Sequence, residues 1–257
     1  MYRDDEEYMI VKESISIIMP AYNAERFIRE SINSVLAQTY NDWHLYVVDD
    51  ASTDGTAAIV KKIKDHRVEY IFLERNGGVA NARNIAIEKA QGKYITFLDS
   101  DDLWEVNKLE IQVLLLEKGY DVVCGNYAIF LTDSNHPTAI RTSLPEFNYH
   151  DMLSCNRIGN LTGIYNRNSL GKFYQEHCGH EDYLMWLSVM KAAKKAACVQ
   201  EVIARYRVSA GSLSGNKLVA AKWQWHIYRG KLHLSLPESL YYWLRYVTTG
   251  LGRKFFN

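Results

Sequence analysis

The chain has 257 residues, of which 47% are hydrophobic, and its 30 lysines and arginines are balanced by 30 aspartates and glutamates. This length suits one large domain, or one domain with a small appendage, and the apolar share excludes a mainly disordered protein. Nucleic-acid-binding proteins usually carry a basic excess, which this chain lacks, so no nucleic-acid partner is expected.

The cysteines and the N-terminal segment indicate where the protein resides. Four cysteines are widely spaced without a Cys-x-x-Cys pair, which argues against a zinc or redox motif. Met1–Glu13 is acidic and lacks the continuous apolar core of a signal peptide. No run approaches the roughly 18 apolar residues of a membrane span. We therefore expect a reduced, cytoplasmic setting.

The first half of the chain alternates strand and helix patterns. The expected strands are Ser14–Met19, Trp43–Val48, Val68–Leu73 and Tyr94–Leu98. Asn23 and either Ser52 or Asp54 can cap the first two helices, and Gly92 can end the third. This order predicts an α/β protein with a Rossmann-like, mostly parallel central sheet and helices on both faces. The carboxyl ends of its strands meet at one edge, where open sheets bind ligands.

The second half has a less regular pattern. A helix over Glu105–Lys118, a strand over Asp121–Asn126, a hairpin reaching Thr142 and a helix near Glu181–Lys194 are expected in turn. No repeat, low-complexity segment or linker interrupts the chain. One domain with a C-terminal extension is therefore the simplest organisation.

Two acidic clusters follow predicted strands. Asp99-Ser100-Asp101 forms an Asp-x-Asp pattern, and carboxylate oxygens are the ligands that hard divalent cations prefer, with phosphate and water completing the shell. Asp49-Asp50 follows an earlier strand, where one carboxylate could accept an N–H from a nucleobase. Viewed alone, either cluster is more often a solvated turn that caps the next helix.

Taken together and in order, these motifs resemble the N-terminal half of family 2 inverting glycosyltransferases, which have the GT-A fold. The segments that carry the resemblance are Ile18–Asn23, Ser31–Thr39, Val48–Thr56, Asn76–Gly78, Ala82–Asn84 and Tyr94–Asp102. The resemblance is dense over residues 14–110 and thinner to about residue 214. It implies an enzyme that uses a nucleotide-diphosphate sugar as donor.

The resemblance also assigns a base pocket. The loop Pro20-Ala21-Tyr22-Asn23 would line it, with the ring of Tyr22 against uracil. Asp50 would accept the base N–H, while Asp49 would hold the loop. Gly77 and Gly78 would let the backbone pass close to the donor, since a side chain there would intrude.

Around the diphosphate, the resemblance implies a metal site for Mn²⁺ or Mg²⁺. Asp101 would be the main metal ligand, and Asp99 would meet the ribose or the metal, with Ser100 between them in the donor site. Arg83 would anchor the diphosphate or pair with these carboxylates, and a structural salt bridge is an equal alternative.

The segment His180–Trp186 resembles the family's Glu-Asp motif at the start of a helix. Asp182 would be the base that deprotonates the acceptor hydroxyl, and Glu181 would orient the acceptor. A helix N-terminus lowers the pKa of a carboxylate, so Asp182 is expected to be ionised at neutral pH. Trp186 could stack on an acceptor sugar or pack in the core, and His180 is at most a pocket-lining residue.

One position departs from the family pattern Tyr-Arg-x-His-x-Gly-Ser-x-Ser. In the matching segment, residues 206–214, Ser209 occupies the histidine position, so metal coordination there is not expected. Arg207 or nearby hydroxyls could compensate.

From Leu236 to Phe255, apolar residues recur at three- and four-residue intervals among aromatic and basic residues. This pattern is typical of an amphipathic helix that lies on a membrane, and equally of one that packs on its own domain or a partner. We therefore divide the chain into a catalytic domain over residues 1–215 and a helical extension over 216–257. The donor-binding half of the domain covers about 14–110 and the acceptor-binding half about 111–215.

The resemblance implies transfer of a sugar from UDP-hexose or UDP-N-acetylhexosamine to a hydroxyl of a lipid-linked glycan, with inversion, in bacterial surface polysaccharide synthesis. The enzyme would be cytoplasmic or peripheral on the inner face of the membrane. A dehydrogenase is excluded, because Pro20–Asn23 stands where Gly-x-Gly-x-x-Gly would follow the first strand. A polyprenyl-phosphate sugar synthase and a non-catalytic binding relative are the alternatives.

Overall fold

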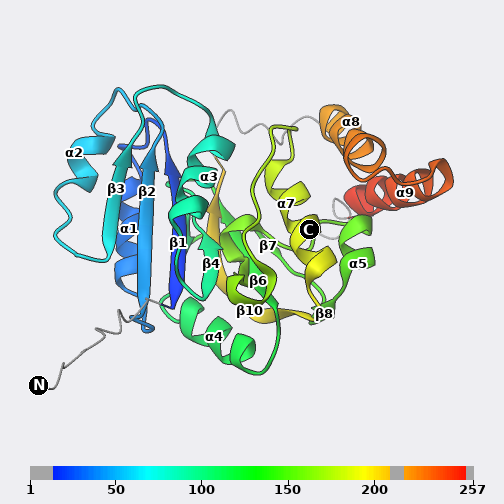
Figure 1. Cartoon of the computed structure of the whole chain (residues 1–257), viewed down its shortest axis with the longest axis horizontal. Helices are drawn as coiled ribbons and strands as arrows, with labels where there is room; N and C mark the ends of the chain where they lie inside the picture. The colour runs from blue at the N-terminus through cyan, green and yellow to red at the C-terminus, as the bar shows by residue number, and fades with distance from the viewer. Residues whose placement is uncertain (1–13, 209–216, 253–257) are drawn as a thin grey trace, which may run out of the picture.

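The computed structural model of the chain describes residues 14–208 and 217–252, and its centre is a ten-stranded mixed sheet (Figure 1). The strands are β1 Ile15–Ala21, β2 Trp43–Asp49, β3 Val68–Phe72, β4 Tyr94–Phe97, β5 Leu103–Trp104, β6 Val122–Phe130, β7 Ala139–Arg141, β8 Glu146–Phe147, β9 Ile164–Asn166 and β10 Ala196–Arg207. The helices are α1 Ile28–Leu36, α2 Thr56–Val60, α3 Val79–Lys89, α4 Lys108–Glu117, α5 Tyr149–Ser154, η1 Asn160–Thr162, α6 Arg167–Leu170, α7 Glu181–Ala192, α8 Lys217–His226, η3 Ile227–Lys231 and α9 Leu236–Gly252.

The four N-terminal strands pair in parallel with one another. Strand β1 pairs in parallel with β2 and β4, and β2 pairs in parallel with β3. The isoleucine-rich β1 is buried along its whole length, because helices cover both faces of the sheet. Ile17 packs in the cluster with α1 and α4, whereas Ile18 packs in the cluster with α3 and α7. The predicted α/β architecture is confirmed.

The second half extends the sheet less regularly. Strand β9 lies antiparallel between β4 and β6, and β6 and β7 form the predicted hairpin. The long strand β10 runs parallel to β6 and was not predicted. Its polar centre, Gln200-Glu201, coincides with a break in register between Val199 and Val202, which hides the strand pattern in the sequence.

Two predicted helix starts are wrong. Helix α1 begins at Ile28 after Phe27, because Asn23 adopts a left-handed conformation with φ 48° and its side-chain oxygen accepts the backbone N–H of Thr53 instead. Helix α4 begins at Lys108 rather than Glu105, since the short strand β5 pairs with β10 directly before it and the backbone N–H of Glu105 still donates to the Ile203 carbonyl of β10.

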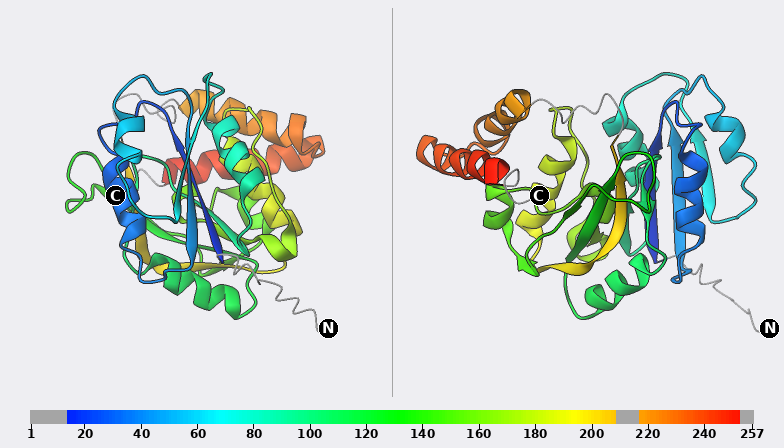
Figure 2. Two further views of the ribbon diagram at one scale, coloured as in Figure 1. Left: turned by 60° about the vertical axis from the view of Figure 1, so that its left-hand side comes forward. Right: turned by 180° about the vertical axis from the view of Figure 1, so that it is seen from behind.

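The C-terminal helices pack on the domain. Helices α8 and α9 lie together beside α5 and α7, away from α1 and α2 (Figure 2). On α9, the Tyr242 hydroxyl lies 3.0 Å from Nδ1 of His150, and Trp243 Nε1 donates to the Ala221 carbonyl at 3.1 Å. Among the described helices, none is both long and apolar enough to cross a membrane.

Candidate functional site

A cavity of about 650 Å³ opens at the carboxyl ends of β1, β2 and β4. It is lined by nine of the ten predicted donor-binding residues and by the predicted base: Pro20, Ala21, Tyr22, Asp50, Gly78, Arg83, Asp99, Ser100, Asp101 and Asp182. We call it the donor cavity. The parallel strands bring these residues together, because each contributes the loop that follows its carboxyl end.

The two neighbouring aspartates after β2 have different partners. Asp49 is buried and its carboxylate accepts the backbone N–H of Ser52 and the hydroxyl of Tyr70, which holds the loop as predicted. Asp50 lines the donor cavity, and its two carboxylate oxygens accept the backbone N–H groups of Gly77 and Gly78 at 2.8 and 2.7 Å. Its role toward a nucleobase stays a prediction.

Gly78 connects this loop to α3. Its φ of +85° favours glycine, and an added Cβ would lie 3.1 Å from the ring of His177. The glycine lines the cavity together with Val79 and Ala82 of the first turns of α3. The amino end of α3 therefore borders the cavity, an arrangement that favours anionic groups such as phosphates.

Arg83 projects from α3 to the Asp-x-Asp segment. Its guanidinium donates to Oδ1 of Asp99 at 2.5 Å and to the side-chain oxygen of Gln175 at 3.0 Å. This ion pair fits both the predicted pairing with the Asp-x-Asp carboxylates and the alternative of a structural salt bridge. The buried Nε atom of Arg83 has no hydrogen-bond partner within the described chain, so this guanidinium retains one donor beside the cavity.

Asp101 and the next residue, Asp102, have carboxylates with too little positive charge around them. Burial, together with the charge of Asp99, raises the pKa of Asp101 to about 6. Asp102 is buried, accepts the backbone N–H of Arg207 with one oxygen, and has no described partner for the other. Burial and its two acidic neighbours raise the pKa of Asp102 well above the ordinary value. The cluster would gain stability from a bound cation.

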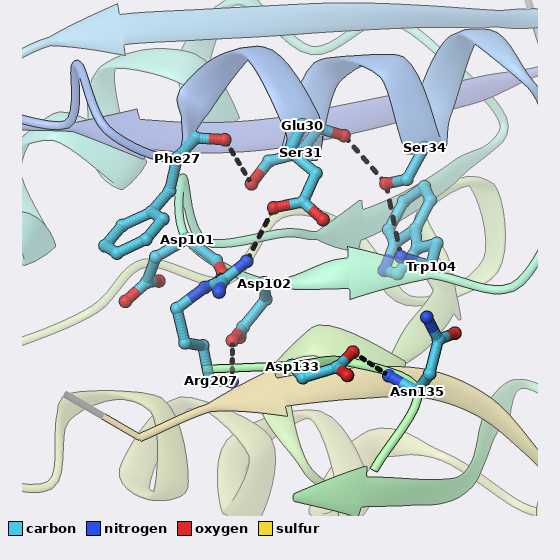
Figure 3. Close-up of polar contacts among 10 residues, drawn as sticks. All are labelled: Phe27, Glu30, Ser31, Ser34, Asp101, Asp102, Trp104, Asp133, Asn135 and Arg207. Carbon is cyan, nitrogen blue, oxygen red and sulfur yellow. Dashed lines mark hydrogen bonds and ion pairs between the residues drawn. The ribbon is translucent and has the colours of Figure 1, made fainter. Parts of the chain in front are cut away.

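Arg207, the last residue of β10, supplies part of the balancing charge. Its side chain donates to the backbone carbonyl of Asp101 at 2.8 Å and to Glu30 of α1 at 2.7 Å (Figure 3). The guanidinium also lies over the rings of Phe27 and Phe130. Arg207 lines the donor cavity, whereas Ser209 lies outside the described residues.

These residues fit a divalent metal only when a donor shares it. Across residues 14–208 and 217–252, no group of three or more histidine, cysteine, aspartate or glutamate side chains is arranged to hold a metal ion. Asp99 is already paired with Arg83 and Asp102 does not line the donor cavity, which leaves Asp101 as the carboxylate of this cluster that lines the cavity without an ion pair. Asp101 would therefore be the ligand that the protein supplies to Mn²⁺ or Mg²⁺, and diphosphate oxygens and water would be the other ligands.

Asp182 is the second residue of α7 and lines two cavities at once. Its predicted low pKa is wrong in direction: burial raises the pKa above the ordinary value, and the nearby guanidinium of Arg83 only offsets part of that effect. A carboxylate with a raised pKa is a better proton acceptor. The position suits a general base, although for a different reason than the helix dipole.

The second cavity, of about 420 Å³, adjoins the donor cavity, and we call it the acceptor cavity. The two cavities share the side chains of Arg83, Asp99, Asp182 and Tyr206. A group seated in either cavity is thus within reach of Asp182. This arrangement places one carboxylate between two adjacent binding spaces.

Three predicted site residues are located elsewhere. Trp186 is fully buried, donates from Nε1 to Asn160 and packs edge-to-face on Phe97, so it is a core residue and cannot stack on an acceptor. Glu181 lines neither cavity and accepts the backbone N–H of Gly179 at 3.3 Å. Asn23 joins two loops beside the donor cavity without lining it.

Two further lining residues come from the C-terminal half. His180 lines the donor cavity as predicted, and its ring meets that of Trp223 edge-to-face at 5.2 Å. Trp223 belongs to α8, in the segment expected to be a separate extension, and no sequence pattern indicated its place at the site. Part of the extension therefore completes the cavity wall.

Comparison with known proteins identifies the class. The sequence matches the family Glycosyl transferase family 2 over residues 16–177. It is 37% identical over 245 residues to the Escherichia coli UDP-Glc:alpha-D-GlcNAc-diphosphoundecaprenol beta-1,3-glucosyltransferase WfgD, covering 95% of this chain and 96% of that protein. The chain belongs to glycosyl transferase family 2.

Solved structures share the fold. S. aureus TarS 1-349, determined in complex with UDP-GlcNAc, superposes with a TM-score of 0.70 at 22% identity, covering 91% of this chain and 71% of that one. The mannosyltransferase PcManGT from Pyrobaculum calidifontis, determined with GDP-Man and Mn2+, gives a TM-score of 0.63 at 19% identity, covering 93% of this chain and 75% of that one. The predicted GT-A fold is confirmed.

Proposed function

We propose that this protein transfers a hexosyl or N-acetylhexosaminyl group from a UDP-sugar to a hydroxyl of a lipid-linked glycan, with inversion, in bacterial surface polysaccharide synthesis. The observation that carries the proposal is the position of Asp182, which lines both the donor cavity and the adjoining acceptor cavity. The similarity to WfgD, whose name specifies UDP-Glc and a diphosphoundecaprenol-linked acceptor, supports the choice of substrates.

In the proposed reaction, the donor occupies the donor cavity with its base near Tyr22 and Asp50 and its diphosphate near Arg83 and Asp101. Bound Mn²⁺ or Mg²⁺ supplies positive charge that stabilises the departing diphosphate. The acceptor hydroxyl enters from the acceptor cavity and loses its proton to the carboxylate of Asp182. As the new carbon–oxygen bond forms, the bond to the diphosphate breaks and the diphosphate leaves with the electron pair.

The test is release of nucleotide diphosphate from a panel of nucleotide sugars with Mn²⁺, compared with EDTA and with Asp101→Ala. We expect release from a UDP-sugar that both the chelator and the substitution abolish, because Asp101 is the carboxylate left for the metal. Calorimetry with UDP and Mn²⁺ measures donor binding separately from turnover. Absence of both donor binding and release would favour a binding protein without transferase activity.

The acceptor type needs its own experiment. Transfer to the hydroxyl of a sugar requires a base, whereas transfer to polyprenyl phosphate needs little help from one. We expect transfer to a sugar hydroxyl that depends on Asp182. If the protein instead glycosylates polyprenyl phosphate, and Asp182→Asn does so equally well, the alternative synthase activity is correct.

Helix α9 supports a peripheral membrane position at the cytoplasmic face. One side packs on the domain through Tyr242 and Trp243. The other side exposes Leu236, Leu240 and Leu244, each with about half or more of its surface accessible, 60%, 49% and 49%. Such a stripe can insert into the interface of a bilayer.

Co-sedimentation with vesicles of neutral and anionic phospholipids tests this position. We expect the wild-type protein to sediment and the double variant Leu240→Ser, Leu244→Ser to remain largely in solution. Leu114→Ser removes an equally exposed leucine from α4 and is the matched control. Equal sedimentation of the wild-type protein and the double variant would assign membrane contact elsewhere, or nowhere.

A further inference from the structure

The acceptor cavity continues into a smaller, positively charged recess. This recess has a volume of about 130 Å³ and shares Tyr127, Arg141, Asn156 and Gly159 with the acceptor cavity. Arg157 also lines it, so two guanidinium-bearing residues meet there, while its described lining contains no aspartate or glutamate. Guanidinium groups remain protonated at all physiological pH values, so the recess carries a permanent positive charge.

The backbone brings the two arginines together from separate segments. Arg141 ends β7, where it pairs with Tyr127 of β6. The loop after α5 approaches through Gly159, since a Cβ there would lie only 2.6 Å from the Tyr127 ring. The side-chain oxygen of Asn156 accepts the backbone N–H of Ile158, which fixes the turn that carries Arg157.

These arginines differ from four other buried or half-buried arginines of the protein. Arg67, Arg83, Arg205 and Arg207 each form an ion pair with a carboxylate at 2.5–2.8 Å. Arg141 and Arg157 form none within the described parts of the chain. Moreover, Nε of Arg157 is buried and has no hydrogen-bond partner there. A buried donor without a partner is costly, so a ligand that accepts from it would be favoured.

We propose that Arg141 and Arg157 form a subsite for the diphosphate that joins the acceptor sugar to its lipid carrier. This inference rests on the proposed function and names the group that the far end of the acceptor site recognises. Arg141 lines the same cavity as Asp182, so an acceptor sugar in that cavity has its reacting hydroxyl at one end and its anionic linkage at the other. Arginine is well suited to phosphate because its planar donors bind two oxygens together.

The subsite also gives a reason for selecting the lipid-linked acceptor over a free sugar. A neutral sugar would leave the unpaired Nε of Arg157 without an acceptor, whereas a diphosphate offers several oxygens to both guanidinium groups. The recess opens from the acceptor cavity and is separate from the lining of the donor cavity, so donor binding does not require it.

Calorimetry with three acceptor probes tests the proposal directly. The probes are α-GlcNAc-diphosphate on a short alkyl chain, the corresponding monophosphate, and neutral octyl α-GlcNAc. We expect Arg141→Gln and Arg157→Gln each to weaken binding of the diphosphate probe about 10-fold or more, because a charge-assisted hydrogen bond is lost. The monophosphate should lose less, and binding of the neutral glycoside and of UDP should stay unchanged.

Arg29→Gln is the matched control, since it removes an exposed guanidinium from α1 on the other side of the molecule. Arg157→Lys keeps the charge and should retain part of the affinity. Thermal unfolding and UDP binding show whether each variant is folded. Equal binding of the diphosphate probe by the wild-type protein and the double glutamine variant would overturn the subsite.

Two further outcomes separate this proposal from others. A methyl glucuronide probe offers a carboxylate instead, and a selective loss of its binding in the variants, with the diphosphate unaffected, would overturn the diphosphate assignment. If variants that bind the diphosphate probe normally still transfer sugar to octyl α-GlcNAc, the subsite fails while the proposed function stands. If no probe accepts sugar but the diphosphate probe still requires both arginines, the proposed transfer fails and the subsite stands.

Discussion

The donor and acceptor sides of the site are built in different ways. On the donor side, short loops at neighbouring strand ends bond to one another, as Asn23 does with Thr53 and Asp50 does with Gly77 and Gly78. On the acceptor side, the walls come from β6, β7, the loop after α5 and α7. A motif in sequence therefore corresponds to a site on the donor side, whereas the acceptor side exists only after distant segments pack.

The same contrast appears in the charges. Arg207 reaches Asp101 from 106 residues further along the chain and balances part of a cluster whose own sequence segment carries only negative charges. Asp182 owes its raised pKa to burial among such distant segments. The charges of the donor side are thus balanced in part by residues from the C-terminal half of the domain. The following experiments separate the contributions of the donor and acceptor sides.

The largest effect is expected for the residue that both sides share. Asp182→Asn should lower kcat by about 10²–10⁴, because the acceptor hydroxyl loses its base, while UDP-sugar binding changes little. Initial-rate kinetics and calorimetry on the same preparation measure the two quantities. In the wild-type protein, the raised pKa also places the acid limb of the kcat/KM profile above that of an ordinary aspartate.

Glu181→Gln is the control for this substitution, since Glu181 lines neither cavity. Its rate should remain close to that of the wild-type protein. If Asp182→Asn kept more than a tenth of the wild-type kcat, the base would have to be sought elsewhere.

Substitutions of Trp186 test whether this residue belongs to the core or to the acceptor-binding surface. Trp186→Ala should lower the free energy of unfolding by about 3–5 kcal/mol, because a buried ring and its bond to Asn160 are lost. Denaturant unfolding measures this change. Trp186→Phe should remain folded and leave the acceptor KM unchanged, whereas an unchanged stability with a raised acceptor KM would return Trp186 to the acceptor site.

Substitution of Asp101 tests whether the negative charges of the donor side destabilise the folded protein. Its folded-state pKa of about 6 lies above the ordinary value, so the native protein binds more protons than the unfolded chain and loses stability as the pH rises through 6. With EDTA present, Asp101→Asn should therefore be more stable than the wild-type protein by about 1–2 kcal/mol at pH 7.5. The difference should vanish near pH 4, as measured by urea unfolding at each pH.

Asp65→Asn is the control with the opposite sign. The ion pair with Arg67 lowers the pKa of Asp65 to about 2, so this carboxylate stabilises the native protein at neutral pH and the contribution is lost as the pH falls from 4 toward 2. A destabilised Asp101→Asn at pH 7.5 would show that the Asp-x-Asp cluster carries no stored repulsion.

The smallest effect is expected at the rim of the donor cavity. Tyr22 is 53% exposed, so Tyr22→Ala should change the free energy of unfolding by less than about 0.5 kcal/mol. If the ring lies against the base, affinity for UDP should fall about fivefold or more, as measured by calorimetry, because stacking on an aromatic contributes about 1–3 kcal/mol. Tyr22→Phe should retain the affinity, and an unchanged affinity of the alanine variant would place the base elsewhere.

The residues of the donor side are recognisable in the sequence because their signals are local. The isoleucine-rich first strand, the aspartates after β2 and the Asp-x-Asp segment after β4 were each recognisable within a few residues. Parallel topology then required them to share one edge. Strand β10 could not be predicted in this way, because its register break disrupts the alternation of apolar residues. Nor could the start of α1, because Asn23 bonds to a loop 30 residues away.

By itself, the sequence determined the family, the α/β architecture and the strand-end residues that line the donor cavity, since short windows of pattern and turn chemistry encode them. Tertiary structure alone decided that Trp186 belongs to the core, that Trp223 of α8 lines the site, and that Arg141 and Arg157 face one recess. Those outcomes depend on which distant surfaces bury each other and exclude water. The free energy that decides between these arrangements is summed over contacts throughout the fold, so no single segment of the sequence contains it.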